Sequence, residues 1–178
     1  VGRRVVRLLK AFGCRILVSD PYVQLTAEDL NDGVIQCSLE RVLAESDVVS
    51  LHPRVTAETT KMINRDTLSQ MKDGAYLINT SRGKLVDTTA LIEALKSGQL
   101  GGVGLDVYEE EEGIFFEDLS GEVLLDDELS RLLTFPNVLI TAHQAFLTQE
   151  ALAEIARVTT DNLTRFAAGE ALVPGTVL

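Results

Sequence analysis

The chain has 178 residues, about the length of one domain, and 46% of them are apolar, which is enough to build a buried core. Sixteen basic and 27 acidic residues leave a formal net charge of −11, which disfavours nucleic acid and anionic membrane surfaces as partners. The sequence has no apolar run long enough to span a bilayer, and Cys14 and Cys37 lack the spacing of a disulfide framework or a metal site. We therefore expect no metal and a reduced, cytoplasmic location.

An amphipathic helix is predicted at the start of the chain. From Gly2 to Phe12, apolar residues recur every three or four positions, and basic residues lie between them. Gly13 can end this helix, and the apolar run 15–19 is then typical of a short strand that stops at Asp20. Because the sequence opens inside a helix, we expect the first strand of the fold to precede Val1.

Four more short apolar runs follow, and polar or helix-like sequence separates them. They span residues 47–52, 75–80, 101–107 and 137–141. The clearest helix occupies 87–99, where Asp87 or Thr88 can cap the first turn and Gly98 can end the last. Apolar strands that alternate with helices predict an α/β fold with a doubly wound parallel sheet covered on both faces. This is the Rossmann-type dinucleotide-binding class, here incomplete at its N-terminus.

A last long helix is predicted from about Thr148 to Ala168, with an apolar stripe on one side. After it, residues 169–178 have no periodic pattern and are expected to form a loose tail. We therefore assign residues 1–168 to a single nucleotide-binding domain and residues 169–178 to a tail.

Acidic residues are concentrated between positions 109 and 128. They occur as EEEE at 109–112, ED at 117–118 and DDE at 126–128. Charge runs of this kind usually lie on a solvated loop, which is the simplest interpretation for most of these carboxylates.

Val1 and Gly2 match the end of a glycine-rich phosphate-binding turn. In a dinucleotide fold the first strand runs into GxGxxG, and the last glycine lies at the start of the next helix. Asp20 ends the following strand, 18 residues after Gly2, where a carboxylate can bind both hydroxyls of the adenine ribose and would repel the 2′-phosphate of NADP. These residues favour NAD as the cofactor. The alternative is that Asp20 and Pro21 form only a turn.

Three separated motifs resemble, in order and spacing, the signature segments of the D-2-hydroxyacid dehydrogenase family. They are NTSRG at 79–83, GLDVYEEE at 104–111 and the histidine of TAHQAF at 141–146. The resemblance covers essentially the whole chain, and the segment GIFFEDLSGEVLLDDELSRLL is more similar to the NAD-dependent D-lactate dehydrogenase branch. It implies an oxidoreductase whose substrate domain lies outside this sequence, with the tail 169–178 returning toward that domain.

The resemblance also implies the catalytic residues. Arg82 is the substrate anchor, because its planar fork can hold a carboxylate with two hydrogen bonds. His143 is the acid/base, since imidazole can take and give a proton near neutral pH, and Glu111 is the partner that orients it. Each alone is more simply a surface arginine, a structural histidine or a solvated glutamate, but the three together in family order favour function. His52 matches a position with a structural role beside the cofactor.

Other positions follow residue by residue from the same resemblance. Thr80 is expected near the nicotinamide ribose and Asp106 near the carboxamide. Phe146 is expected to line the substrate pocket, or alternatively to pack in the core. Pro53 and Arg54 match cofactor-loop positions, although the proline comes one place earlier than in the family. Arg54 beside the adenosine would weaken the preference for NAD over NADP.

The leading hypothesis is hydride transfer between NADH and a 2-keto acid, with pyruvate to D-lactate as the favoured reaction. The alternatives are a dehydrogenase for another D-2-hydroxy acid and an NAD(H)-sensing transcriptional corepressor of the C-terminal-binding-protein type, since fold and motif do not fix function. The net charge of −11 and the FFED segment at 115–118 argue against the corepressor. The resemblance further implies a homodimer at full length, and we expect the isolated chain to be inactive and poorly stable.

Overall fold

The computed structural model describes residues 1–26, 33–118 and 121–176. Contacts between residues divide the chain into two compact units, Val1–Ala142 and His143–Leu178. The described strands all belong to the first unit, and the second unit is built around one long helix.

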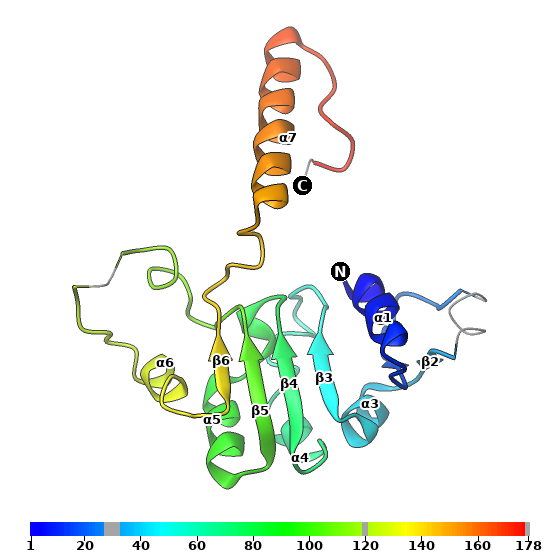
Figure 1. The fold of residues 1–178 in the computed structure, drawn as a ribbon, viewed down its shortest axis with the longest axis vertical. Coiled ribbons are helices and arrows are strands. Elements are labelled where there is room, and N and C mark those ends of the chain that lie inside the picture. Colours follow the sequence, from blue (N-terminus) through cyan, green and yellow to red (C-terminus); the bar gives the residue numbers. More distant parts are fainter. Residues whose placement is uncertain (27–32, 119–120, 177–178) are drawn as a thin grey trace. The chain divides into compact units, whose positions relative to one another are not determined.

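Four parallel strands form the central sheet of the first unit, in the order β3-β4-β5-β6 (Figure 1). They are β3 (Val48–Leu51), β4 (Ala75–Asn79), β5 (Leu100–Leu105) and β6 (Val138–Ile140). Each lies within, or one residue beyond, a predicted apolar run. Because the strands are parallel, their carboxyl ends meet at one edge of the sheet, where doubly wound folds bind ligands.

A second, smaller sheet precedes the central one in the chain. β1 (Leu17–Val18) pairs in parallel with β2 (Ile35–Gln36). The predicted strand 15–19 is therefore only two residues long, because its partner strand offers only two residues to pair with. Helix α1 (Gly2–Ala11) precedes β1 and agrees with the predicted helix, and α3 (Leu39–Glu45) follows β2.

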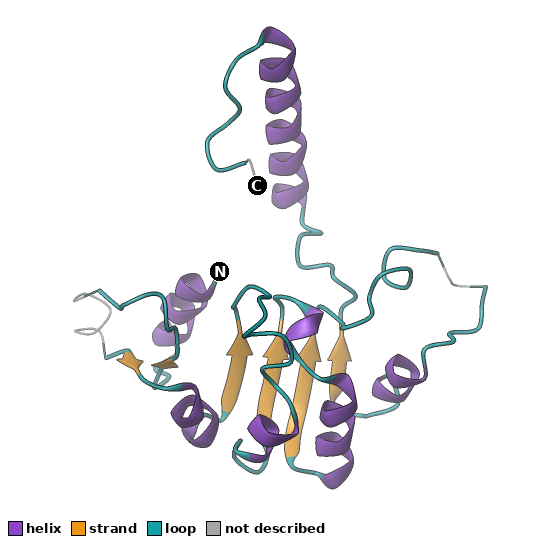
Figure 2. Ribbon diagram, turned by 180° about the vertical axis from the view of Figure 1, so that it is seen from behind, coloured by secondary structure: helices purple, strands orange, loops and turns teal. Residues whose placement is uncertain are grey.

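Helices α4 (Arg65–Ser69) and α5 (Thr88–Ser97) cover one face of the central sheet (Figure 2). The predicted ends of α5 are confirmed, since Asp87 accepts a hydrogen bond from Ala90 N at 3.0 Å and Gly98 has a φ of 76°. Leu91 of α5 is buried in the same core as Leu77 of the sheet. The short 3-10 turn η1 (Gly83–Leu85) precedes α5, and α6 (Asp127–Leu132) precedes β6.

The opposite face of the central sheet is exposed. Val48 and Tyr76 are register partners on this face and are 57% and 51% exposed, and Leu139 of β6 is 66% exposed. The predicted coverage of both faces is therefore not observed among the described residues. The burial of the strands alternates because only the side that meets α4 and α5 is packed.

The second unit contains α7 (Gln149–Ala168) and the segment that follows it. The Thr148 hydroxyl caps this helix by accepting a hydrogen bond from Ala151 N at 3.2 Å, and Gly169 ends it with a φ of 69°. The predicted tail folds back, and Val173 N donates to Asn162 Oδ1 at 2.9 Å. Within the described ranges, no helix is both long enough and apolar enough to cross a membrane.

Candidate functional site

The predicted phosphate-binding residues lie at the amino end of α1. Val1 takes the N-cap position, and its carbonyl accepts a hydrogen bond from Arg4 N at 2.9 Å. Gly2 lies against the residue that follows β3, because a Cβ added to Gly2 would be 3.4 Å from His52 Cδ2. The first turn contains no acidic residue. Since the first N–H groups of a helix have no partner within it, this end can accept an anion.

Asp20 follows β1 and is exposed. Its Oδ1 accepts hydrogen bonds from Tyr22 N at 2.9 Å and Val23 N at 3.1 Å, which forms the turn that was the alternative interpretation. The carboxylate nevertheless stays at the carboxyl end of a strand, where the ribose interpretation requires it. The ribose role of Asp20 therefore stays a prediction.

The loop after β3 is tied to the loop after β4. The His52 ring lies 3.0 Å from the Ser50 hydroxyl, and burial lowers the pKa of His52, which favours a neutral imidazole. The Pro53 carbonyl accepts a hydrogen bond from Ser81 Oγ at 2.8 Å, so the early proline still gives the loop a contact through its oxygen. Arg54 is exposed.

Asn79 shapes the turn that carries Arg82. It ends β4, is only 1% exposed, accepts from Ser81 N at 3.1 Å and donates to the Arg82 carbonyl at 2.9 Å. Thr80 and Arg82 are both exposed on this turn, and Arg82 Nη1 donates to the Ser81 carbonyl at 2.7 Å. No role for Asn79 was predicted from the sequence. The available signal was a polar residue that ends an apolar strand directly before the signature turn.

Asp106 joins the ends of three strands. It is buried directly after β5, and its N–H donates to the Asn79 carbonyl at 2.9 Å. Its Oδ1 accepts a hydrogen bond from the Thr141 hydroxyl, which follows β6, at 2.5 Å. The side chain expected near the carboxamide is thus held in one orientation at the carboxyl edge of the sheet.

The loops of Arg82 and Glu111 touch through their backbones. A Cβ added to Gly83 would lie 1.8 Å from the Tyr108 carbonyl oxygen, so only glycine leaves room for the contact as it stands. Glu111 is half-buried, and its Oε2 accepts a hydrogen bond from Tyr108 N at 3.1 Å. Tyr108 therefore contacts Glu111 through its N–H and Gly83 through its carbonyl.

His143 is the first residue of the second unit. Ala142 and His143 have φ values of 51° and 54°, in the left-handed region that costs energy for residues other than glycine and that often occurs at functional sites. Phe146, in the same unit, is 45% exposed, which does not match packing in a core. The first unit brings the loops of Arg82 and Glu111 together, while the meeting of His143 with them stays a prediction.

The solvated-loop interpretation was made for most of the carboxylates between positions 109 and 128, and three of them bind distant parts of the fold. Glu109 is 15% exposed and accepts hydrogen bonds from Thr88, and Asp126 accepts from the buried Tyr108 hydroxyl at 2.9 Å. Glu128 accepts from the Thr89 hydroxyl at 2.5 Å. These partners are distant in the sequence, so no local pattern identified them. In the described part of the chain, no three His, Cys, Asp or Glu side chains are grouped so as to hold a metal ion.

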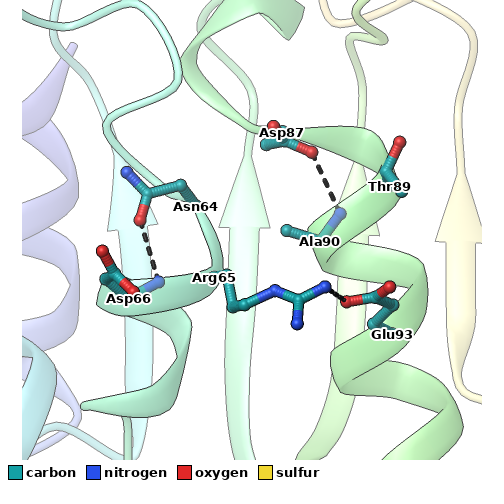
Figure 3. Close-up of a pocket in the computed structure, with 7 residues that line it drawn as sticks. All are labelled: Asn64, Arg65, Asp66, Asp87, Thr89, Ala90 and Glu93. Carbon is teal, nitrogen blue, oxygen red and sulfur yellow. Dashed lines mark hydrogen bonds and ion pairs between the residues drawn. The ribbon is translucent and has the colours of Figure 1, made fainter.

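A surface pocket of about 350 Å³ lies at the amino ends of α4 and α5 (Figure 3). An ion pair between Arg65 and Glu93 crosses it. The lining residues are Asn64, Arg65, Asp66, Asp87, Thr89, Ala90 and Glu93. None of the predicted site residues lines this pocket, so it is distinct from the predicted site.

The chain is similar in sequence to 2-hydroxyacid dehydrogenases. The sequence model described as "D-isomer specific 2-hydroxyacid dehydrogenase, NAD binding domain" matches residues 1–145. The chain is 52% identical over 166 residues to 2-hydroxyacid dehydrogenase A of Aspergillus oryzae, covering 93% of this chain and 47% of that protein. It is 46% identical over 170 residues to a D-lactate dehydrogenase of Escherichia coli, covering 96% of this chain and 51% of that protein.

Solved structures of similar proteins with NAD bear on the cofactor. The D-lactate dehydrogenase from Aquifex aeolicus, complexed with NAD and lactic acid, matches with a TM-score of 0.85 at 40% identity, covering 95% of this chain and 51% of that one. The chain thus spans about half the length of the curated relatives it matches.

Proposed function

We propose that the whole protein reduces a 2-keto acid with NADH. The chain belongs to the D-isomer-specific 2-hydroxyacid dehydrogenase family and matches the NAD-binding domain of that family. Pyruvate and D-lactate are the proposed pair. The identity of 46% to a protein named D-lactate dehydrogenase and the GIFFED segment at 113–118 support this choice. NADH, when bound, supplies the hydride.

The residues at the carboxyl edge suit a dinucleotide. The amino end of α1, at Gly2, offers N–H donors to a pyrophosphate, and the exposed Asp20 carboxylate suits the ribose hydroxyls. Asp106 would accept from the amide of the nicotinamide, and Thr80 lies on the adjacent turn. Because Asp106 is already oriented by Thr141, binding would not have to order its side chain.

One observation carries the proposed chemistry: the backbone contact between the loops of Arg82 and Glu111 at Gly83. In the proposed reaction, the Arg82 guanidinium holds the substrate carboxylate and polarises the ketone. His143 donates a proton to the carbonyl oxygen, and Glu111 holds the imidazole ring in the orientation that this transfer needs. The contact at Gly83 sets the distance between the loop of Arg82, which binds the substrate, and the loop of Glu111, which orients His143.

A substrate panel tests this proposal. Full-length protein is mixed with NADH or NADPH and with pyruvate, a branched and an aromatic 2-keto acid, and loss of absorbance at 340 nm is followed. We expect the highest kcat/KM with NADH and pyruvate. A preference for another acid would reassign the substrate, whereas NADH binding with no turnover of any acid would contradict the enzyme and favour a nucleotide-sensing protein.

His143→Ala in the full-length protein tests the proton donor. We expect kcat to fall by about 10²–10⁴-fold, because general acid catalysis is lost, while the Kd for NADH changes little. Titration of NADH fluorescence measures the second quantity. An equal loss of both would indicate that His143 is a structural residue.

The location and assembly of the whole protein are part of the same proposal. Free thiols at Cys14 and Cys37 support the cytoplasm. A homodimer is proposed at full length, and sedimentation measures it directly. We expect the isolated 178-residue chain to show no NADH oxidation with pyruvate, since it spans about half of its relatives.

A further inference from the structure

The loops that follow β3, β4 and β5 are joined at one carboxylate, that of Glu109. Its Oε2 accepts hydrogen bonds from Thr88 N at 3.2 Å and from Thr88 Oγ1 at 3.1 Å, at the start of α5. Its Oε1 forms an ion pair with Lys61 Nζ at 2.9 Å, on the segment that follows β3. Only 15% of the Glu109 side chain is exposed, so its hydrogen bonds to Thr88 are partly shielded from solvent, whereas the Lys61 side chain is 46% exposed and its ion pair reaches the surface.

Lys61 is itself held in an unusual conformation. Its φ of 52° lies in the left-handed region, which costs energy for a residue with a side chain. Its N–H donates to the Lys84 carbonyl at 2.8 Å, and its ammonium group is also 3.4 Å from Asp87. The backbone and the side chain of Lys61 therefore bind different parts of the segment that carries Arg82 into α5.

The Glu109 contacts reach the proposed reacting groups through one neighbouring residue. Glu109 directly follows Tyr108, whose N–H donates to Glu111 at 3.1 Å. The Tyr108 carbonyl lies against Gly83, the residue after Arg82. A shift of the peptide between Tyr108 and Glu109 would therefore change two contacts at the same time: the hydrogen bond to Glu111 and the packing against Gly83, which follows Arg82.

We propose that Glu109 is a positioning residue, which uses Thr88 and Lys61 to hold the loop of Glu111 at its working distance from the loop of Arg82. This inference rests on the proposed function. We assign Glu109 no contact with the substrate. Its effect passes through Tyr108 to the two residues that bind the carboxylate and orient the imidazole.

Glu109→Ala in the full-length enzyme tests the inference. We expect kcat/KM for the 2-keto acid to fall by about 10–100-fold, because displacements near 1 Å at a reacting centre cost up to about 10²-fold. Both kcat and KM for the keto acid should change more than KM for NADH, since Asp20, α1 and the hydrogen bond between Asp106 and Thr141 lie outside the contacts of Glu109. A residue that only stabilises the fold would leave kcat per folded enzyme unchanged.

Glu110→Ala is the matched control, because Glu110 is exposed and its loss removes the same charge from the adjacent position. It should behave as wild type. Glu109→Gln keeps an oxygen that can accept from Thr88 and should recover most of the activity lost in Glu109→Ala. Lys61→Met removes the same ion pair from the other side, together with the longer contact to Asp87, so we expect an effect at least as large as that of Glu109→Gln and a double variant whose loss is smaller than the sum of the two.

Two outcomes would overturn this inference and leave the proposed function standing. In the first, the wild-type enzyme is active and Glu109→Ala has the same kcat/KM. In the second, Glu109→Ala has a lower thermal midpoint but an unchanged kcat. If Glu109→Ala does not fold, additive effects of Glu109→Gln and Lys61→Met would still contradict it. A wild-type protein that reduces no 2-keto acid would instead remove the proposed function, and this inference with it.

Discussion

Replacing Gly83 with alanine tests whether the contact between the loops of Arg82 and Glu111 is required. A Cβ at Gly83 would lie 1.8 Å from the Tyr108 oxygen, 2.1 Å from its carbonyl carbon and 2.6 Å from Glu109 N. All three atoms belong to the backbone, so no side-chain rotation can relieve the overlap. Real Cβ atoms essentially never approach closer than 3.0 Å, so the two loops must separate by at least about 1.2 Å.

The expected cost has two parts. Forcing an extra carbon into a packed contact destabilises a protein by about 1–3 kcal/mol. A displacement of about 1 Å between Arg82 and Glu111 should lower kcat/KM for the 2-keto acid by a factor on the order of 10². The assay is steady-state kinetics of the full-length enzyme together with urea unfolding. Binding of NADH should be preserved.

Gly121→Ala is the control for this experiment, since a Cβ there would meet nothing within 4 Å. It should leave both kinetics and stability unchanged. If Gly83→Ala kept the wild-type kcat/KM and the wild-type unfolding midpoint, this contact would not hold the loops of Arg82 and Glu111 at their working distance.

Three further substitutions test separate parts of the site in the full-length protein. Arg82→Lys should raise KM for pyruvate and lower kcat with NADH binding unchanged, because lysine cannot hold a carboxylate bidentately; unaltered kinetics would remove Arg82 from the site. Burial lowers the pKa of His52, so the stability linked to its neutral imidazole is complete above about pH 6.5, the unfolded value, and is lost as the pH falls below it toward the lowered folded-state pKa. His52→Gln should therefore flatten the change in urea midpoint between about pH 7.5 and 5.5, and an unchanged slope would contradict this. Tyr108→Phe should destabilise by about 1–2 kcal/mol through loss of the bond to Asp126, whereas Tyr22→Phe, 82% exposed, should not; equal unfolding midpoints would show that the bond contributes nothing.

Helix ends were the features most completely predicted from local sequence. Helix α5 begins at the capping oxygen of Asp87 and ends at the left-handed Gly98. Helix α7 begins and ends in the same way, at Thr148 and Gly169. A cap acts through hydrogen bonds to residues three or four positions away. Such ends can therefore be identified without knowledge of the tertiary structure.

Strand length and burial were predicted less well. The apolar run 15–19 yields only two paired residues in β1, and Val48 and Tyr76 are exposed although their strands are strongly apolar. A strand extends only as far as its neighbour offers hydrogen-bonding groups, and a face is buried only where another element packs on it. Neither condition can be predicted from the sequence of the strand alone.

The sequence alone determined the class of fold and the order of the site loops, because parallel strands bring their carboxyl ends to one edge whatever the details of packing. Only the tertiary structure showed that Gly83 meets Tyr108 and that Glu109 binds Lys61 and Thr88. Lys61 precedes Glu109 by 48 residues, and one glutamate in a run of four looks like its neighbours. Contacts between loops depend on how the strands beneath them are spaced, so a linear pattern of charges cannot reveal which carboxylate is buried and which is solvated.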